Sequence, residues 1–185
     1  MPLPKDRSTS HHDHHPPHIF LDDAWYLVTG STHQKGRLLE PEGHKGLVRN
    51  QLKELIAEFH FKLAAWVILD NHYHVLIKTQ AGSDLPRFFG RLHGRISYEV
   101  NRLEGQRGRQ VWHSYWDTCV RGENDYWQRF NYIHQNPVKH GYVSQIEDWP
   151  FSSYGYYLKH KGKDWLMDAF LQFPIVDFSD REDDF

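Results

Sequence analysis

The spacing of apolar positions divides the chain into predicted strands and helices. Short runs rich in aromatic and β-branched residues predict strands at 25–29, 62–69, 72–79 and 115–120. Apolar residues at intervals of three and four predict helices over 47–59, 85–103 and 124 to about 135. The elements therefore follow one another in the order β-α-β-β-α-β-α.

This order predicts an α+β fold of the ferredoxin-like, split βαβ type. We expect a four-stranded antiparallel sheet with helices on one face, followed by a C-terminal extension. Asp70 and Asn71 are turn residues between the second and third strands and predict a hairpin there. Pro137 disfavours helical backbone at Asn136, so the last helix is expected to end near residue 135, before a short turn that ends at Gly141.

Composition divides the chain into three parts. Residues 1–18 form a His- and Pro-rich leader with too few apolar residues to fold, and we expect it to be disordered. Residues 19–160 are long enough to form one domain with a core of its own. Residues 161–185 are expected to be an acidic C-terminal tail, because residues 164–185 carry seven acidic side chains and one basic. The tail is either a solvated, disordered end or a segment that lies over a basic site as a mimic of nucleic acid.

Charge and cysteine content narrow the classes of function. The formal net charge of the chain is −2, so the part that precedes the acidic tail is mildly basic, which suits a protein that binds phosphates. No apolar run approaches the roughly 18 residues that a membrane span needs, and no signal peptide is seen. The single cysteine, Cys119, excludes an internal disulfide and is expected to be a small buried residue. We therefore expect a soluble, cytoplasmic protein with no membrane partner.

Two histidines in the third predicted strand are the first candidates for chemistry. His72 and His74 are two residues apart, so in a strand both imidazoles leave the same face, while Tyr73 points the other way. Two neutral imidazoles side by side can chelate a divalent metal. The alternative is a pair of partly exposed sheet residues.

A tyrosine and an asparagine in the last predicted helix are the second candidates. Tyr132 and Asn136 share a helix face if the helix continues, because residues four apart are neighbours. The alternatives are that Tyr132 is a packed aromatic and that Asn136 is the N-cap of the short turn that begins at Pro137. Spacing alone favours these alternatives over a role in catalysis.

Basic and aromatic residues offer candidate contacts to nucleic acid. Arginines recur along the predicted helix 85–103 and in the glycine-containing loop after it, and either grip phosphates or form an ordinary solvated face. They are Arg87, Arg91, Arg95, Arg102, Arg107 and Arg109. Trp112, Tyr115 and Trp116 either stack on unpaired bases or belong to the core, and we expect two of the three to be core.

Three motifs in order give the chain a family resemblance. Asn71-His72-Tyr73-His74 is followed by Tyr-Ile-x-x-Asn-Pro-Val-Lys-x-Gly over 132–141 and by Trp-Pro-Phe-Ser-Ser-Tyr over 149–154. This pattern resembles the REP-associated tyrosine transposases of the single-tyrosine HUH, or IS200-like, transposase superfamily. The resemblance runs from about residue 25 to 157. The chain departs from the family at Asp70, where proline is usual, and at Gln135, where an apolar residue is common.

The resemblance implies a role for each candidate residue. It makes His72 and His74 ligands of a divalent metal, Mg²⁺ or Mn²⁺, and Asn136 the third ligand or its close neighbour. It makes Tyr132 the nucleophile of a catalytic domain that spans residues 19–160. The implied reaction is cutting and rejoining of single-stranded or hairpin DNA through a 5′-phosphotyrosine, by a monomer or a homodimer.

Other functions are compatible with the same fold. A non-catalytic nucleic-acid-binding module of the RNA-recognition type shares this topology, although such a module displays aromatics at the centre of its sheet, where this chain has His72 and His74. A metal-dependent hydrolase without a covalent intermediate is a second alternative. A domesticated hairpin-DNA nuclease that no longer transposes is a third.

Overall fold

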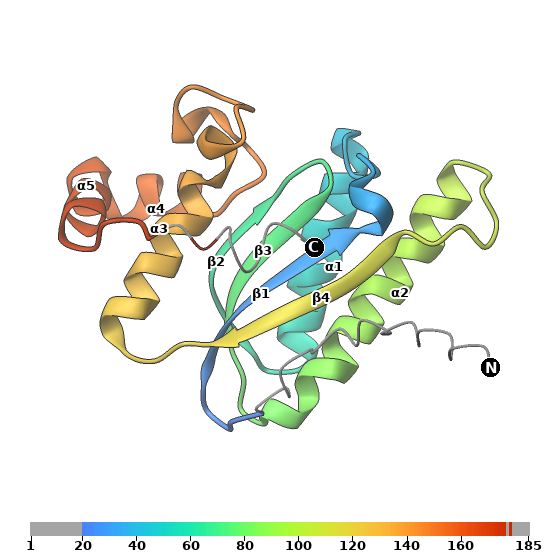
Figure 1. Cartoon of the computed structure of the whole chain (residues 1–185), viewed down its shortest axis with the longest axis horizontal. Coiled ribbons are helices and arrows are strands. Elements are labelled where there is room, and N and C mark those ends of the chain that lie inside the picture. The colour runs from blue at the N-terminus through green and yellow to red at the C-terminus, as the bar shows by residue number, and fades with distance from the viewer. Residues whose placement is uncertain (1–19, 177, 179–185) are drawn as a thin grey trace, which may run out of the picture.

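The computed structural model describes residues 20–176 and residue 178, and its centre is a four-stranded sheet (Figure 1). The strands are β1 (Trp25–Thr32), β2 (Lys62–Ile68), β3 (His72–Lys78) and β4 (Trp112–Cys119). The α-helices are α1 (Glu42–Glu58), α2 (Leu85–Leu103), α3 (Glu123–Lys139), α4 (Tyr154–Lys161) and α5 (Lys163–Gln172). Short 3₁₀ turns lie at His33–Lys35, Gly82–Asp84 and Ile146–Asp148. The strand order is β2-β3-β1-β4 and every pairing is antiparallel, which confirms the predicted α+β, split βαβ fold.

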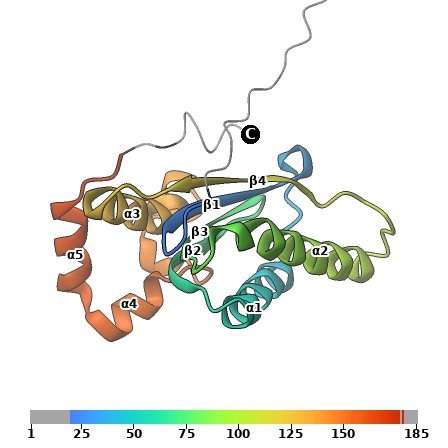
Figure 2. The same ribbon diagram turned by 90° about the horizontal axis from the view of Figure 1, so that it is seen from below.

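One face of the sheet carries the larger core. Side chains alternate along a strand, so Tyr73, Val75 and Ile77 of β3 all point to this face, together with Tyr26 and Val28 of β1. The helices that connect the strands, α1 and α2, pack side by side against it (Figure 2). This layer is the helical layer that the order of elements predicted.

The opposite face is partly covered by α3. Leu27, Val67 and Leu76 point to this face and pack against Phe130 and Ile133 of the helix, which contacts β2 and β3. Helices therefore lie on both faces of the sheet, and the second layer belongs to the C-terminal part of the chain. This layer matters for function because it lies over the strand that carries the histidine pair.

Helix α3 does not end where the sequence predicted. It continues through Pro137 to Lys139, so Asn136 lies inside the helix rather than at the N-cap of a separate turn. Pro137 is tolerated because it lies in the last turn, where only the carbonyl of Ile133 loses its usual N–H donor. The helix then closes normally, since the His140 N–H donates to the carbonyl of Asn136 at 3.0 Å.

The folded part extends beyond the predicted boundary at residue 160. Residues 163–172, assigned to an acidic tail, form α5 and bury Leu166 and Ala169. The segment was assigned to a tail because of its acidic residues, although its apolar residues have helical spacing. Asn131 of α3 anchors this helix by donating to the carbonyl of Ala169 at 2.8 Å. The predicted leader over 1–18 lies outside the described residues, as does nearly all of the chain after residue 176.

The structure also bears on the predictions for Cys119 and for membrane-spanning segments. Cys119 is half-buried at the end of β4 rather than buried. Within residues 20–176 and 178, no helix combines the length and the apolar character needed to cross a bilayer.

Candidate active site

The two histidines lie under α3 on the less covered face of the sheet. The alternation along β3 points both imidazoles to this face, and their ring centroids are 5.0 Å apart. His72 is 9% exposed and His74 is 0% exposed, so they are not the partly exposed sheet residues of the alternative interpretation. Burial of two polar rings is costly unless they have partners, and this makes their hydrogen bonds informative.

Each imidazole has a partner at its Nδ1 atom. The Thr29 hydroxyl lies 2.7 Å from Nδ1 of His74, and Asn71 Oδ1 lies 2.7 Å from Nδ1 of His72. A ring that donates its Nδ1–H keeps the lone pair on Nε2, which is the atom then able to bind a metal. For His72 this atom faces α3, where Asn136 Oδ1 lies 3.3 Å away.

The turn before the pair is held by buried charges. Asp70, which replaces the proline usual in the family, is 4% exposed and its carboxylate lies 2.6 Å from Lys45 Nζ of α1. Lys45 is itself 3% exposed. Arg37 adds a second contact to the same carboxylate at 2.6 Å. A paired, buried carboxylate fixes this turn to α1, and Asn71 and His72 follow it directly.

Helix α3 supplies the other half of the site. Tyr132 and Asn136 lie one turn apart and are 1% and 0% exposed. The Tyr132 ring lies edge-on to that of His74, with centroids 5.3 Å apart, and Asn136 faces His72. The structure therefore brings together all four residues that the family motifs single out.

Three more side chains surround Tyr132 and His72. Lys139 Nζ lies 5.1 Å from the centroid of the Tyr132 ring, and the ring of Phe178 lies 5.3 Å from it. The His140 ring lies 5.1 Å from that of His72. Lys139 and His140 follow the motif tyrosine by seven and eight residues, so helical periodicity could have found them had the helix been expected to continue.

Other tyrosines near the site face elsewhere. Tyr126 packs edge-on against Trp25 with centroids 5.1 Å apart, and burial raises the pKa of its phenol to about 12. Tyr142 packs against Trp149 at 5.0 Å. Of these three tyrosines, Tyr132 is the one whose ring contacts the histidine pair.

The donor set can hold a divalent cation. His72, His74 and Asn136 offer two imidazole nitrogens and one amide oxygen, which leaves positions open for water and phosphate. In the described part of the chain, no cluster of three or more His, Cys, Asp or Glu residues that could hold a metal is found. The 3.3 Å contact between His72 Nε2 and Asn136 Oδ1 joins two atoms of the kinds that bind metals. The residues are therefore of the kinds that can hold the implied divalent ion.

The predicted arginine stripe lies away from this site. Helix α2 covers the opposite face, and its arginines make ion pairs: Arg87 with Asp84 at 3.1 Å, Arg91 with Glu58, Arg95 with Glu58 at 3.5 Å, and Arg102 with Glu99 at 2.6 Å. In the loop that follows, Arg109 pairs with Glu104 at 2.6 Å. Their placement favours the solvated-face interpretation.

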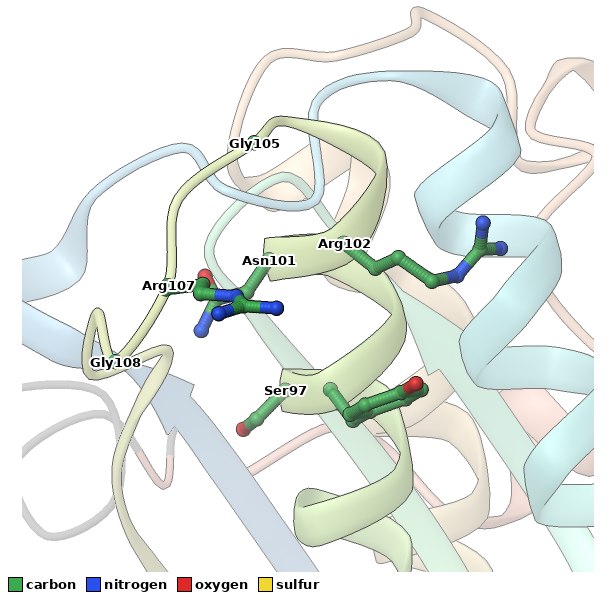
Figure 3. Close-up of a pocket in the computed structure, with 7 residues that line it drawn as sticks. Ser97, Asn101, Arg102, Gly105, Arg107 and Gly108 are labelled. Atoms are coloured by element: carbon green, nitrogen blue, oxygen red, sulfur yellow. The ribbon is translucent and has the colours of Figure 1, made fainter.

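A hollow of about 450 Å³ lies at the C-terminal end of α2 (Figure 3). Arg102 and Arg107 line it, together with Asn101 and the loop glycines Gly105 and Gly108. Figure 3 shows that the guanidinium groups of Arg102 and Arg107 lie apart, with that of Arg107 beside Asn101. The hollow therefore does not present the two guanidinium groups to a single phosphate.

Two of the three candidate aromatics belong to the core. Trp112 is 6% exposed and stacks on His93 at 4.3 Å, and Tyr115 stacks on Phe89 at 4.7 Å. Both lie on the side of the sheet that α1 and α2 cover. Trp116 points to the face that carries the histidines.

A split βαβ sheet with a His-x-His pair on its third strand, facing a tyrosine and an amide one helical turn apart, defines a class of single-tyrosine DNA transposases. A family model described as "Transposase IS200 like" matches residues 22–136, a span that contains all four site residues. The chain belongs to the IS200-like transposase family.

Curated relatives and a solved structure agree with this assignment. A REP-associated tyrosine transposase of Escherichia coli (strain K12) is 28% identical over 132 residues, which is 71% of this chain and 76% of the relative. A putative REP-associated tyrosine transposase of Haemophilus influenzae is 29% identical over 116 residues, which is 57% of this chain and 66% of the relative. A solved structure of a REP-associated tyrosine transposase bound to a REP hairpin is 24% identical and has a TM-score of 0.66. That likeness covers 80% of this chain and 87% of the other and supports the fold.

Proposed function

We propose that this transposase-family chain is a metal-dependent, single-stranded DNA endonuclease and strand transferase that acts on hairpin DNA through a 5′-phosphotyrosine. The observation that carries the proposal is the meeting of Tyr132 with His74, and of Asn136 with His72, in one buried site. One chain supplies all four residues. We therefore propose that the site is complete within a chain, in a monomer or in a homodimer.

The covalent step follows from the chemistry of the side chains. The phenol oxygen of Tyr132 attacks the phosphorus and the bond from phosphorus to the 3′-oxygen breaks. The DNA on the 3′ side of the cut then stays on the tyrosine through its 5′-phosphate. The phenol loses its proton and the departing 3′-oxygen gains one. A phosphodiester is exchanged for a phosphodiester, so the reverse reaction rejoins DNA without another energy source. A free phenol has a pKa of about 10, so Tyr132 must lose its proton as it attacks. Lys139 Nζ lies 5.1 Å from the centroid of its ring.

His72, His74 and Asn136 would hold the divalent ion. Bound there, the ion would polarise a phosphate oxygen and offset the charge that develops during attack. Thr29 and Asn71 orient the imidazoles through their Nδ1 atoms. Burial of the site limits access of water to the phosphotyrosine.

The substrate class comes from the relatives. A related transposase has been solved with a REP hairpin, and we propose a hairpin flanked by unpaired nucleotides for this chain as well. Arg102, Arg107 and Arg109, at the end of α2, are proposed phosphate contacts for DNA that reaches around the β4 edge. Arg102 and Arg109 would exchange their ion pairs with Glu99 and Glu104 for these phosphate contacts. Arg87, Arg91 and Arg95 lie nearer the N-terminal end of α2 and are proposed to make at most peripheral contacts.

The proposal is tested with hairpin-bearing single-stranded oligonucleotides in the presence of Mn²⁺. Denaturing electrophoresis should reveal a covalent protein–DNA adduct together with a fragment that ends in a 3′-hydroxyl. Cutting without an adduct would favour the hydrolase, and binding without cutting would favour a non-catalytic module. A second, labelled oligonucleotide distinguishes a strand transferase from a nuclease that only cuts and reseals, because transfer joins the two.

A further inference from the structure

A lysine beside the turn between β2 and β3 is almost completely buried. Lys45 of α1 is 3% exposed, and a buried ammonium group is costly unless it is paired. Its Nζ lies 2.6 Å from Asp70 Oδ1 and donates to the carbonyl of Glu40 at 2.6 Å. The ring centroids of Trp149 and Phe151 lie 5.6 and 5.7 Å from the same nitrogen, within the range of a cation–π contact. One ammonium group therefore joins α1, the turn before the histidine pair and the segment that precedes α4.

The motif Trp-Pro-Phe-Ser-Ser-Tyr over 149–154, which the proposed function leaves without a role, ties this lysine to β2 and to α3. Trp149 Nε1 donates to the carbonyl of Ile68 at 3.2 Å, and the Ile68 N–H donates to the carbonyl of Phe151 at 2.9 Å. The Trp149 ring also packs against that of Tyr142, with centroids 5.0 Å apart. Because Tyr142 lies three residues after the last residue of α3, the motif connects the end of β2 with the chain that leaves this helix.

Both halves of the candidate active site meet at this turn. On the strand side, Asp70 is followed directly by Asn71, whose Oδ1 lies 2.7 Å from Nδ1 of His72. On the helix side, burial and the nearby charge of Asp70 raise the pKa of the Tyr142 phenol, and a hydrogen bond with the Asp70 backbone lowers it, which places this phenol against the same turn. A displacement of Asp70 would therefore alter the 3.3 Å separation of His72 Nε2 from Asn136 Oδ1.

Stability alone does not account for a buried pair of this kind. The cost of removing two charges from water offsets much of their attraction, so an apolar pair of similar size often stabilises a fold equally well. What an ion pair adds is a defined distance between two particular atoms, here between α1 and the turn. The other cation on the same carboxylate, Arg37, is 60% exposed, so solvent screens that contact.

We propose that Lys45 is a positioning residue for the metal site, and that it acts by holding Asp70, and with it the turn that leads into His72, at a fixed distance from α1. The inference rests on the proposed function, because it names further residues that serve the same site. Asp70 stands where the family usually has proline, so in this chain the turn is constrained by a contact with another element rather than by a pyrrolidine ring.

The double variant Lys45→Met/Asp70→Asn separates positioning from charge. It removes one positive and one negative charge together, so the net charge near a bound cation is unchanged and no unpaired ion is left buried. Calorimetric titration with Mn²⁺ should show binding weaker by about ten-fold or more, the loss typical of a group that orients a metal ligand. Urea unfolding of the same sample should show that the variant is folded.

The single variant Lys45→Met opposes the two explanations. Loss of a positive charge near a cation site would tighten Mn²⁺ binding if only electrostatics mattered, whereas loss of positioning weakens it. Arg37→Met is the matched control, because it removes a cation from the same carboxylate at an exposed position, and it should not weaken binding. Leu92→Ala, in the core under α2, is the control for reduced stability and should bind Mn²⁺ like the wild type.

Wild-type Mn²⁺ affinity in the double variant, or tighter binding by Lys45→Met, overturns the inference, while the covalent-adduct assay with the wild type still supports the proposed function. Equal weakening by Leu92→Ala overturns it too, since the loss would then follow from reduced stability. A double variant that unfolds would assign the pair to stability instead and has the same consequence. A wild-type chain that binds no Mn²⁺ also overturns the inference, and if that chain forms no adduct the proposed function fails with it.

Discussion

The hydroxyl of Thr29 lies 2.7 Å from Nδ1 of His74, and the two residues face each other directly across the β1–β3 pair. When the ring donates its Nδ1–H to this hydroxyl, the lone pair that it presents elsewhere is the one on Nε2. Asn71 makes the equivalent contact to His72 at the same distance. Both rings are thereby held with Nε2 as the available ligand atom, one through a neighbouring strand and the other through the preceding turn.

Thr29→Val should weaken metal binding without changing the shape of the side chain. Loss of a group that orients a histidine ligand typically costs about 10- to 100-fold in metal affinity. Calorimetric titration with Mn²⁺ measures this directly, and Thr29→Ser, which keeps the hydroxyl, should bind nearly as well as the wild type. If Thr29→Val binds Mn²⁺ with wild-type affinity, the hydroxyl does not position His74 for a metal.

Tyr132→Phe should abolish the covalent adduct and leave hairpin binding nearly unchanged, because only one hydroxyl is lost. Mass spectrometry of the trapped wild-type adduct should find the nucleotide on Tyr132. Tyr126→Phe is the control from the same helix, and it should still form the adduct because its ring packs against Trp25 instead of the histidines. A nucleotide on any other tyrosine contradicts the assignment.

Asn136→Ala should shift the metal concentration needed for half-maximal cleavage upward by about ten-fold or more, since one of three protein ligands, or its neighbour, is removed. Excess Mn²⁺ should restore part of the activity. Gln135→Ala is the adjacent control; Gln135 is half-buried and lines a different surface, near α5. Identical metal titrations for the two variants would exclude Asn136 from the metal site.

Stability should fall in mild acid because of His134. This imidazole is fully buried on α3, and burial lowers its pKa to about 3 from an ordinary value of 6.5. Below pH 6.5 the unfolded chain takes up a proton that the folded chain does not, so the free energy of unfolding decreases as the pH falls. Between pH 7.5 and pH 5 this one group should cost about 2 kcal/mol.

Urea unfolding of the wild type and of His134→Gln at the two pH values isolates this contribution. The variant should lose roughly that much less stability on acidification, whatever its stability at neutral pH. The same comparison with His113→Gln, an exposed position on β4, is the control for the loss of one histidine. Parallel behaviour of His134→Gln and wild type would show that His134 is not a source of acid sensitivity.

Local sequence was sufficient to predict most of the fold. The helix over 85–103 has the bounds that its apolar spacing predicts, and the four strands follow from runs of aromatic and β-branched residues. The prediction was wrong at Pro137 and in the C-terminal tail. A proline in the last turn of a helix costs little, so it does not have to end the helix. A short apolar stripe among acidic residues is easily overlooked. Whether each of these segments is helical depends on tertiary contacts, which composition does not reveal.

The candidate site, too, could be predicted from the sequence only in part. Period-two spacing predicts that His72 and His74 share a face, but it does not predict that α3 lies over them. The hydrogen bond between His74 and the Thr29 hydroxyl depends on strand register, which joins positions 45 residues apart. The family motifs, and not the spacing of residues, predicted that Tyr132 acts together with the two histidines.

The continuity of α3 through Pro137 has a mechanical consequence. Tyr132 and Asn136 are separated by one turn of unbroken helix, so about 6 Å of rigid rod joins the nucleophile to the group beside His72. Helix α3 is flanked by two glycines with positive φ, Gly122 and Gly141, whose backbone can adopt conformations that other residues resist. Any displacement that admits DNA to the buried phenol therefore carries Asn136 with it, and closure of the helix restores both groups in a single movement.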